Sequence, residues 1–390
     1  MKRILLSLIA LASLFAVSCA SNNAAPTAAA EKTASVSAQV TALTNIDKYG
    51  DLTLTATTRD LRAAGFEYAD MLAVSFNGQT VTVPMIPHYR YVASKGSALV
   101  AFPDEAKAVQ LEIFNGSFAA TYGLADKTVN EDKTFFWTAR EGVAFPLDVT
   151  ITLAQKQGYY KEYLVFDLHR TNSRADYTAL TDEQFANFRE VTTSGMGEKK
   201  LYRSSSPVNP EIGRNTFADA AAKAAGVHTF LNLADDEKSA QKYAGFAESY
   251  YASQNVIFLG LGVDFSTQNN RDGLCDGLRA LLKKPAPYLV HCTEGQDRAG
   301  FVSAVLECLM GASFDEVKAD YMTTFENYYG VKKGSDQYAA ISENIVKGLS
   351  VAFGTKDLAK ADLAALAAKY LQEIGLSADE VSALKAKLGK

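Results

Sequence analysis

The sequence predicts an α/β domain with a central parallel-rich sheet flanked by helices, preceded by an all-β barrel or sandwich domain. Two observations support this. Between residues 40 and 155, apolar and polar residues alternate with a period of two, as they do in half-buried strands. Over residues 156–390, short apolar runs alternate with helical patterns, an order of elements that is typical of parallel strands covered by helices. These two segments are the predicted domains.

Residues 1–18 have the pattern of a signal peptide. Two basic residues precede an apolar run from 4 to 17, which is shorter than the ~20 residues that a membrane-spanning helix needs. The run ends in "AVSC", which resembles a bacterial lipobox and predicts lipidation of Cys19; an ordinary signal peptide cut at a neighbouring small residue is the alternative. Residues 19–39 are then a lipidated tether. We expect a lipid-anchored protein of the cell membrane or outer membrane that faces outside the cytoplasm.

The composition is that of a soluble globular protein with room for two domains. Of its 390 residues, 48% are hydrophobic and 21% are charged. The formal charge of −5, without a basic stripe, argues against nucleic acid as a partner. If Cys19 carries lipid, the remaining thiols are Cys275, Cys292 and Cys308. An odd, sparse set of cysteines argues against a disulfide framework, so one thiol can be free for chemistry.

The predicted all-β domain contains roughly six or seven strands. Its strongest local signal is Asn77-Gly78 between two alternating segments, because both central residues of a type I′ hairpin turn need positive φ. The stretches "NIDKYGDLTLT", "VSFNG" and "NGSFAATYG" resemble the C-terminal β-barrel of the S-adenosylmethionine hydrolase and fluorinase family. The active site of that family also requires an N-terminal α/β domain, which does not precede this segment. The resemblance therefore implies a spacer or docking module without that activity.

The second domain begins a regular alternation of strands and helices. We expect Gly226 to end the first of these helices in the left-handed conformation. Ligands bind parallel sheets at the carboxyl ends of the strands, and Cys292 follows the last strand. The expected elements are a helix over 215–226, a strand over 227–234, a helix over 235–253, a strand over 255–262, a helix over 271–283 and a strand over 288–292.

The segment "HCTEGQDRAG" has the arrangement of an oxyanion-binding loop around a nucleophile. A helix beginning near Asp297 and running to Met310 would direct its free N–H groups and positive dipole end at the loop, where they stabilise a thiolate and bind phosphate oxygens. Arg298 offers a two-pronged donor to the same group. Gly295 allows the turn that points successive amides inward. His291 can orient the strand end or stabilise the thiolate.

This loop resembles the H-C-x5-R signature of the cysteine-dependent tyrosine and dual-specificity phosphatases, and in particular the H-C-x-x-G-K-D-R-T-G loop of the bacterial tyrosine and lipid phosphatase group. The segments "NFREVTT" (187–193) and "LYRSSSP" (201–207) are similar to that group as well, and the resemblance covers residues 160–390. It implies that Cys292 is the nucleophile, that Arg298 clamps the phosphate, and that no metal or other cofactor is needed. The implied phosphate-binding residues are Thr293, Glu294, Gly295, Gln296, Asp297 and Arg298.

Two residues depart from the group's pattern. Gln296 replaces the usual lysine, which removes a cation beside the phosphate and weakens the case for multiply phosphorylated substrates. Ala299 replaces a threonine or serine whose hydroxyl helps the cysteine sulfur to leave from phosphocysteine. We expect slower breakdown of that intermediate as a result.

The general acid has two candidates. Dual-specificity relatives carry an aspartate on a loop upstream of the nucleophile, and Asp264 lies 28 residues upstream of Cys292, after a predicted strand. Asp297, inside the loop, is the rival that the bacterial group suggests. Asp264 is the first choice on sequence grounds.

The resulting hypothesis is phosphomonoester hydrolysis through a phosphocysteine intermediate, on phosphotyrosine or other phosphoprotein substrates. One alternative is a phosphate-binding or scaffolding lipoprotein with weak turnover, which Gln296 and Ala299 keep open. The other is a phosphoinositide or inositol polyphosphate phosphatase, because the same loop serves such enzymes. The expected partners are the phosphorylated substrate and, through the N-terminal lipid, a membrane.

Overall fold

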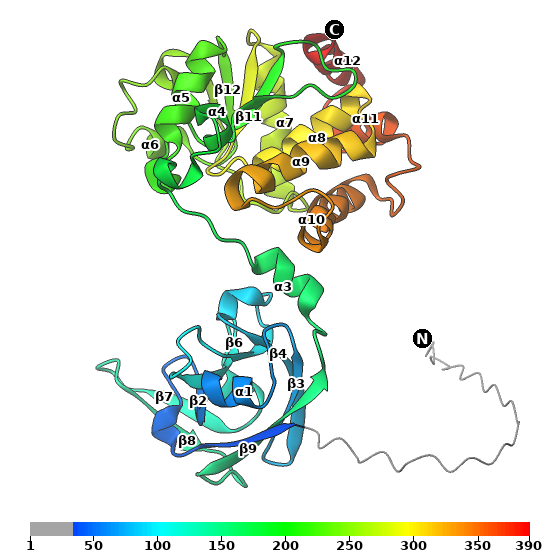
Figure 1. Ribbon diagram of the computed structural model, residues 1–390. Coiled ribbons are helices and arrows are strands. Elements are labelled where there is room, and N and C mark those ends of the chain that lie inside the picture. The colour runs from blue at the N-terminus through cyan, green and yellow to red at the C-terminus, as the bar shows by residue number, and fades with distance from the viewer. Residues whose placement is uncertain (1–33) are drawn as a thin grey trace, which may run out of the picture.

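The computed structural model describes residues 34–390. The predicted signal peptide, the lipidation site Cys19 and most of the predicted tether lie outside the described residues. Figure 1 shows a β-rich body and a mixed α/β body, with the short helix α3 (Tyr160–Phe166) between them. Over residues 34–390, no helix combines the length and the apolar character that crossing a membrane requires.

The N-terminal region is rich in β-strands, as predicted. Its main sheet has seven strands in the order β1-β9-β3-β4-β5-β6-β2, and β7 and β8 form a separate two-stranded ribbon. The short helices are α1 (Thr58–Ala63) and α2 (Phe118–Thr121). The strands are β1 (Ser35–Val40), β2 (Leu52–Thr57), β3 (Met71–Phe76), β4 (Gln79–Ile86), β5 (Ser97–Val100), β6 (Ala108–Ile113), β7 (Ala125–Val129), β8 (Phe135–Ala139) and β9 (Leu147–Gln155).

The first strand begins earlier than the predicted end of the tether at residue 39. β1 starts at Ser35, which pairs with Thr152 of the antiparallel strand β9. Small residues such as Ala38 look tether-like in sequence, but here Ala38 and Val40 are buried in the sheet's core. The composition of this stretch therefore hid a strand whose apolar residues alternate with polar ones.

The β3–β4 hairpin turns at the predicted position. Asn77 has φ of 44° and Gly78 has φ of 70°, the left-handed values that a type I′ turn needs. At the two ends of the main sheet, the backbone N–H of Gln39 in β1 donates to Oγ1 of Thr55 in β2 at 2.9 Å. The two edge strands thus meet, and the sheet curls toward a barrel (Figure 1).

The C-terminal region is a mixed α/β structure, as predicted. Its five-stranded sheet has the order β10-β11-β14-β12-β13, and every neighbouring pair is parallel except β10 with β11. The strands are β10 (Arg189–Glu190), β11 (Leu201–Ser204), β12 (Thr229–Asn232), β13 (Asn255–Phe258) and β14 (Tyr288–His291). The helices are α4 (Asp182–Phe185), α5 (Asn215–Ala224), α6 (Glu237–Ala240), α7 (Gln268–Leu282), α8 (Asp297–Met310), α9 (Phe314–Tyr329), α10 (Asp336–Phe353), α11 (Leu363–Glu373) and α12 (Ala378–Leu388).

Most of the predicted elements of this region are present, and one is wrong. Gly226 has φ of 66° after α5, as expected, and α7 and α8 lie where their patterns predict. The helix expected over 235–253 is reduced to the single turn of α6, followed by turns that include Gly245 at φ of 80°. Aromatic residues of this stretch, such as Tyr251, pack in a satellite cluster with β12 instead of repeating along one helical face.

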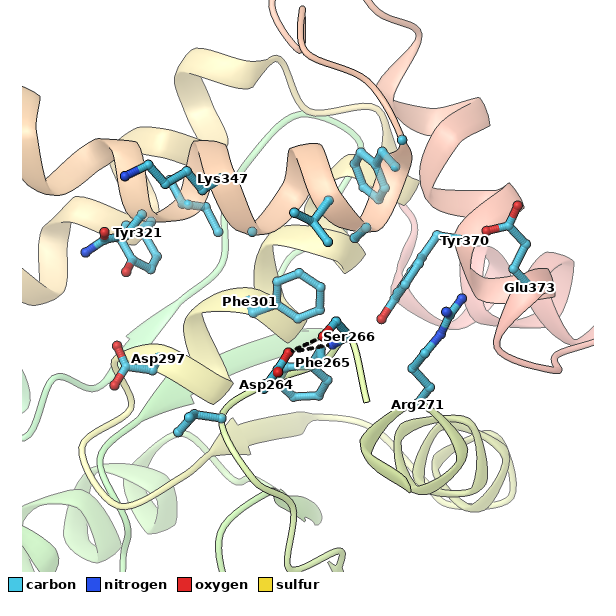
Figure 2. Close-up of a pocket in the computed structure, with 18 of the residues that line it drawn as sticks. Asp264, Phe265, Ser266, Arg271, Asp297, Phe301, Tyr321, Lys347, Tyr370 and Glu373 are labelled. Carbon is cyan, nitrogen blue, oxygen red and sulfur yellow. Dashed lines mark hydrogen bonds between the residues drawn. The ribbon is translucent and has the colours of Figure 1, made fainter. Parts of the chain in front are cut away.

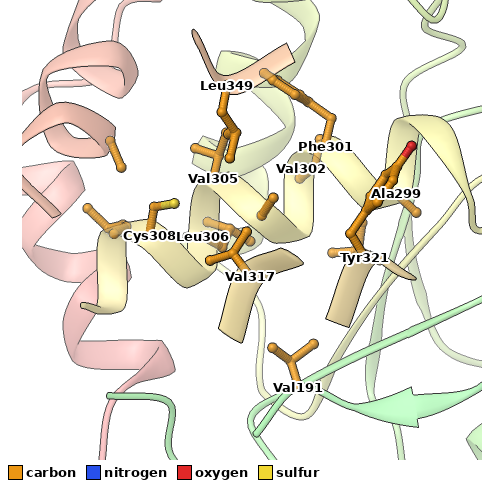
Figure 3. Close-up of a cluster of buried hydrophobic side chains, with 14 of the residues drawn as sticks. Val191, Ala299, Phe301, Val302, Val305, Leu306, Cys308, Val317, Tyr321 and Leu349 are labelled. Carbon is orange, nitrogen blue, oxygen red and sulfur yellow. The ribbon is translucent and has the colours of Figure 1, made fainter. Parts of the chain in front are cut away.

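Helix α8 is buried along almost its whole length, because it runs through the centre of the α/β body. Figure 3 shows its apolar side chains in contact with Val317 and Tyr321 of α9 and with Leu349 of α10. Ala299, Val302, Val305 and Leu306 are among the residues of α8 that belong to this core. Packing around α8 from Ala299 onward holds the helix in place, and with it the loop that precedes it.

Helix α3 contacts both bodies. On the β side, the rings of Tyr163 and Tyr91 lie 5.0 Å apart between centroids. On the α/β side, Nε2 of Gln337 in α10 donates to the carbonyl oxygens of Leu164 at 3.2 Å and Asp167 at 2.9 Å. The segment that leaves α3 is therefore held from two directions.

Candidate active site

The loop between β14 and α8 depends on a glycine. Gly295 has φ of 70°, and a Cβ at this position would lie 2.2 Å from the carbonyl oxygen of Ser204. β11 runs parallel to β14, so its end brings the Ser204 carbonyl against the loop. Only glycine fits this backbone conformation and this contact.

The carbonyl oxygens of the loop point outward and are all anchored. The Thr293 oxygen accepts from the Ser206 N–H at 3.1 Å, the Glu294 oxygen from the Tyr328 hydroxyl at 2.7 Å, and the Gly295 oxygen from Arg203 Nη2 at 2.8 Å. Across residues 34–390, no acceptor pairs with the backbone N–H groups of 293–298. Because the carbonyls face away, these amides are left unpaired in a concave turn, the arrangement that an anion-binding nest requires.

Cys292 and Arg298 lie at the two ends of this nest. Cys292 follows β14 directly and is only 3% exposed. Arg298 is fixed in place by Nη1, which donates to the Leu261 carbonyl at 2.9 Å, and by Nη2, which lies 3.4 Å from Thr293 Oγ1. Its Nε is buried and has no partner in the described part of the chain. The guanidinium thus retains a donor for an oxyanion bound in the loop.

His291, the last residue of β14, supports the start of the loop. It is fully buried, and burial lowers the pKa of its imidazole to about 4. Nε2 lies 3.2 Å from the Tyr251 hydroxyl, which accepts from Asn232 Nδ2 at 3.0 Å, and Nδ1 lies 3.4 Å from the Cys292 carbonyl oxygen. A neutral ring protonated on Nδ1 satisfies all these contacts. The ring therefore holds the strand end, and it is not a proton donor near neutral pH.

A buried ionic cluster, formed by Arg189, Arg203 and Asp320, supports the same loop. Arg203 Nη1 and Arg189 Nε donate to the two carboxylate oxygens of Asp320 at 2.6 and 2.7 Å. Burial opposes the charge on Asp320, but the two guanidinium groups hold the pKa of the carboxyl well below its usual range. Sequence reasoning missed this cluster. The available signal was an arginine within each of the segments "NFREVTT" and "LYRSSSP".

The two candidate acids have opposite electrostatic environments. The Asp264 carboxylate accepts from the hydroxyl and N–H of Ser266 at 2.6 and 2.9 Å, and these bonds lower its pKa. Desolvation raises the pKa of Asp297, and the negative charge of Glu294 raises it further. Figure 2 shows both aspartates at the same cavity, with the Asp264 carboxylate directed at Ser266.

That cavity has a volume of about 620 Å³ and extends from the start of α8 toward α10 and α11. Its apolar wall includes Phe265 and Phe301, whose rings stack with centroids 4.7 Å apart. Three cationic side chains also line it, from α7, α10 and α11: Arg271, Lys347 and Lys369. In the part of the chain from 34 onward, no cluster of three or more histidine, cysteine, aspartate or glutamate residues could hold a metal ion.

The two residues that depart from the expected loop pattern have clear environments. Gln296 is half-buried, and its Oε1 accepts from the Tyr329 hydroxyl at 3.1 Å. Ala299 is fully buried in the core cluster around α8, beside Tyr321 (Figure 3). The structure thus holds the expected loop residues together, with a polar neutral side chain where a lysine is usual.

Comparison with known proteins relates this region to a known family. Residues 234–390 match the model of the tyrosine phosphatase family. The C-terminal region is thus similar to the tyrosine phosphatase family over these residues. This match supports the domain as a phosphoric monoester hydrolase, and it includes Cys292, Arg298 and both candidate acids. No curated protein matches the sequence.

Three solved structures are similar to this chain at low overall scores. An uncharacterized conserved protein from Thermotoga maritima is 11% identical with a TM-score of 0.23, covering 31% of this chain and only 37% of its own. TpbA from P. aeruginosa, in complex with phosphotyrosine, is 17% identical with a TM-score of 0.27, covering 44% of this chain and 98% of its own. The core catalytic domain of the PP-IP phosphatase SIW14 from S. cerevisiae, in complex with citrate, is 17% identical with a TM-score of 0.25, covering 40% and 83%.

Proposed function

We propose that the C-terminal domain hydrolyses phosphate monoesters through a phosphocysteine intermediate on Cys292. The observation that carries this proposal is the direction of the loop: its carbonyls are anchored outward by Ser206, Tyr328 and Arg203, which leaves its amides free to face an oxyanion. Cys292 lies at one end of this nest, and α8 begins at the other end. Free amides at a helix N-terminus favour both a thiolate and a phosphate group.

The reaction takes place in two displacements. In the first, the Cys292 thiolate forms a bond to phosphorus while the ester oxygen leaves and takes a proton from a carboxylic acid. In the second, the resulting carboxylate removes a proton from water, the water oxygen attacks phosphorus, and the thiolate leaves with inorganic phosphate as the product. Arg298 and the loop amides stabilise the charge that develops on the phosphoryl oxygens in both steps.

We assign the general acid role to Asp297 ahead of Asp264, which reverses the order expected from sequence. A general acid must carry its proton at the start of the first step, so a raised pKa favours Asp297. The hydrogen bonds from Ser266 stabilise the ionised form of Asp264, which makes it a weaker proton donor. Asp264 is better suited to fixing, through Ser266, its own segment of the cavity wall.

For the substrate, we propose phosphotyrosine or another phosphoprotein group. The stacked rings of Phe265 and Phe301 give the cavity beside Asp297 a flat apolar wall, which suits an aromatic leaving group. A polyphosphorylated inositol or phosphoinositide is the second candidate, because Arg271, Lys347 and Lys369 line the same cavity. These cations could bind the additional phosphate groups of such a substrate, for which Gln296 supplies no positive charge.

The decisive experiment compares the wild-type chain with Cys292→Ser in reducing buffer that contains a chelator. We expect the wild type to hydrolyse p-nitrophenyl phosphate and a phosphotyrosine peptide faster than inositol hexakisphosphate. Cys292→Ser should lose turnover, because a serine hydroxyl stays protonated at neutral pH, and should still bind inorganic phosphate. Binding without turnover in the wild type would instead favour a phosphate-binding scaffold, and turnover by Cys292→Ser would exclude the phosphocysteine mechanism.

A further inference from the structure

We propose that Arg170 completes the charge balance of the phosphate-binding loop from upstream of the residues that match the family. Arg170 lies in the segment that leaves α3, whereas the family match begins at residue 234. In this role Arg170 is a positioning residue that neutralises Glu294, so that the loop can accept a phosphate dianion. This inference rests on the proposed function.

The geometry of the Arg170–Glu294 pair is close and defined. Arg170 Nη2 lies 2.5 Å from Glu294 Oε1, and the two side chains are only 20% and 31% exposed. Arg170 Nη1 donates to Asn172 Oδ1 at 2.9 Å, which fixes the guanidinium plane. A charge-assisted bond in this half-buried setting is stronger than an exposed ion pair, since water screens it less.

The loop needs such a cation because its own charges do not favour phosphate. Between Cys292 and Ala299, the charged side chains are Glu294, Asp297 and Arg298, and the usual lysine is replaced by Gln296. With both acids ionised, these side chains sum to one negative charge, which would repel a dianion. Pairing Glu294 with Arg170 removes that excess charge, and protonation of Asp297 then leaves Arg298 to balance the charge of the Cys292 thiolate.

Both bodies of the molecule fix the position of Arg170. The hydroxyl of Tyr91, from the β-rich body, donates to Asp167 Oδ1 at 3.0 Å. Gln337 of α10 donates to the Asp167 carbonyl at 2.9 Å, three residues before Arg170. The linker is therefore anchored to both sides immediately before it delivers its arginine to the loop.

The test measures p-nitrophenyl phosphate kinetics and competitive inhibition by inorganic phosphate in full-length variants. Arg170→Ala should raise KM and the inhibition constant of phosphate about tenfold, the effect of ~1.4 kcal/mol of lost binding, with a smaller change in kcat. Arg170→Lys should recover much of the loss. The decisive variant is Arg170→Ala combined with Glu294→Gln, which removes the unpaired charge and should bring both constants to within about threefold of wild type.

A matched control is Arg279→Ala, because Arg279 Nε pairs with Glu380 at 2.9 Å in a similar half-exposed setting between α7 and α12. It should leave both constants unchanged. The inference is overturned if Arg170→Ala behaves like this control, or if the double variant is no better than Arg170→Ala, which would indicate a purely structural role. Thermal melts confirm that each variant is folded.

Measurements on the wild type distinguish a failure of this inference from a failure of the proposed function. If the wild type does not hydrolyse the ester, the proposed function fails, and calorimetric titration with inorganic phosphate still tests Arg170 through the same variants. A tenfold loss of phosphate affinity in Arg170→Ala, recovered by Glu294→Gln, then supports the inference without catalysis. Absence of phosphate binding in the wild type overturns both.

Discussion

Gly295 determines the geometry of the loop at the scale of a single residue. Its left-handed backbone and its contact with the Ser204 carbonyl leave no space for a side chain. The neighbouring positions supply different chemical groups. Cys292 supplies the thiol, Arg298 a fixed cation and Asp297 a carboxyl group whose pKa is raised. Each role depends on the immediate surroundings of the side chain as well as on its type.

The first prediction concerns Gly295→Ala. We expect activity to fall at least about 100-fold, because a shift of the loop by the order of 1 Å misplaces the reacting groups. Gly226→Ala is the control, since Gly226 has a similar φ of 66° with nothing within 4 Å of an added Cβ. This control should lose some stability to backbone strain and keep its kcat/KM. Equal activity of the two variants would show that the Ser204 contact does not constrain the loop.

The second prediction separates the two candidate acids by their dependence on the leaving group. Asp297→Asn should slow hydrolysis of phenyl phosphate about 100-fold, because its leaving oxygen needs a proton, and should slow p-nitrophenyl phosphate much less. Asp264→Asn should slow both esters by a similar, small factor. Single-turnover rates measure the first step directly, and the reverse pattern would assign the proton transfer to Asp264.

At the scale of elements, the parallel strands β11, β12 and β14 end side by side and deliver the parts of the site. The register aligns His291 with Ser204 on one side and with Asn232 on the other. The ionic cluster of Arg189, Arg203 and Asp320 then joins α9 to the loop, through the bond from Arg203 to the Gly295 carbonyl. Support for the loop thus comes from elements far apart in sequence.

The third prediction tests this support through Asp320→Asn. Removing one partner of a buried ion pair leaves the two arginines unbalanced, and we expect a loss of about 3 kcal/mol in the free energy of unfolding. Asp126→Asn is the control, since Asp126 forms an exposed pair with Arg140 and should give no measurable change. Denaturant titration measures both. Equal stabilities of the two variants would contradict a role for the cluster.

The same cluster predicts how the free energy of unfolding depends on pH. The pKa of Asp320 is lower in the folded chain than its ordinary value, so its contribution to stability is complete above the ordinary aspartate pKa of ~3.9. That contribution is lost as the pH falls below this value toward the folded pKa. Asp320→Asn should therefore differ most from wild type near neutral pH and least in strong acid.

The sequence predicted the elements that depend on local pattern and missed those that depend on distant contacts. The helix over 215–224 and the Asn77-Gly78 turn follow from periodicity and from backbone preference, so both were predictable. The strand β1 was hidden by small residues whose burial depends on β9. Arg170 and Asp320 were missed because only the fold brings them to the loop. Arg170 lies 124 residues before its partner Glu294, and Asp320 lies 25 residues after Gly295.

At the scale of the whole molecule, two bodies of different architecture share one linker. α3 contacts Tyr91 on the β side and Gln337 on the α/β side, so the β-rich body is joined to the phosphatase domain next to its loop. We propose that this body acts as a spacer or docking module between the predicted anchor and the enzyme. Its contacts with the linker also fix where Arg170 enters the site.

The fourth prediction concerns the anchor at Cys19. Cys19→Ala should move the protein from the membrane fraction to the soluble fraction without changing its kcat/KM, because Cys19 precedes both predicted domains in the sequence. Fractionation and mass spectrometry of the mature N-terminus measure this. A native chain that carries no lipid, or a Cys19→Ala variant that stays in the membrane fraction, would exclude lipidation as the means of attachment.

The burial of α8 has a consequence for how the molecule opens. Its amides are protected by core packing on every side, whereas the hairpin of β7 and β8 carries the exposed side chains of Val129 and Phe136. Local opening occurs first where few apolar contacts must be broken. In native-state hydrogen exchange, the hydrogen-bonded amides of α8 beyond its first turn should exchange only on global unfolding, and those of the ribbon by small fluctuations. The phosphate nest would then stay assembled through every partial opening that leaves the centre of the domain intact.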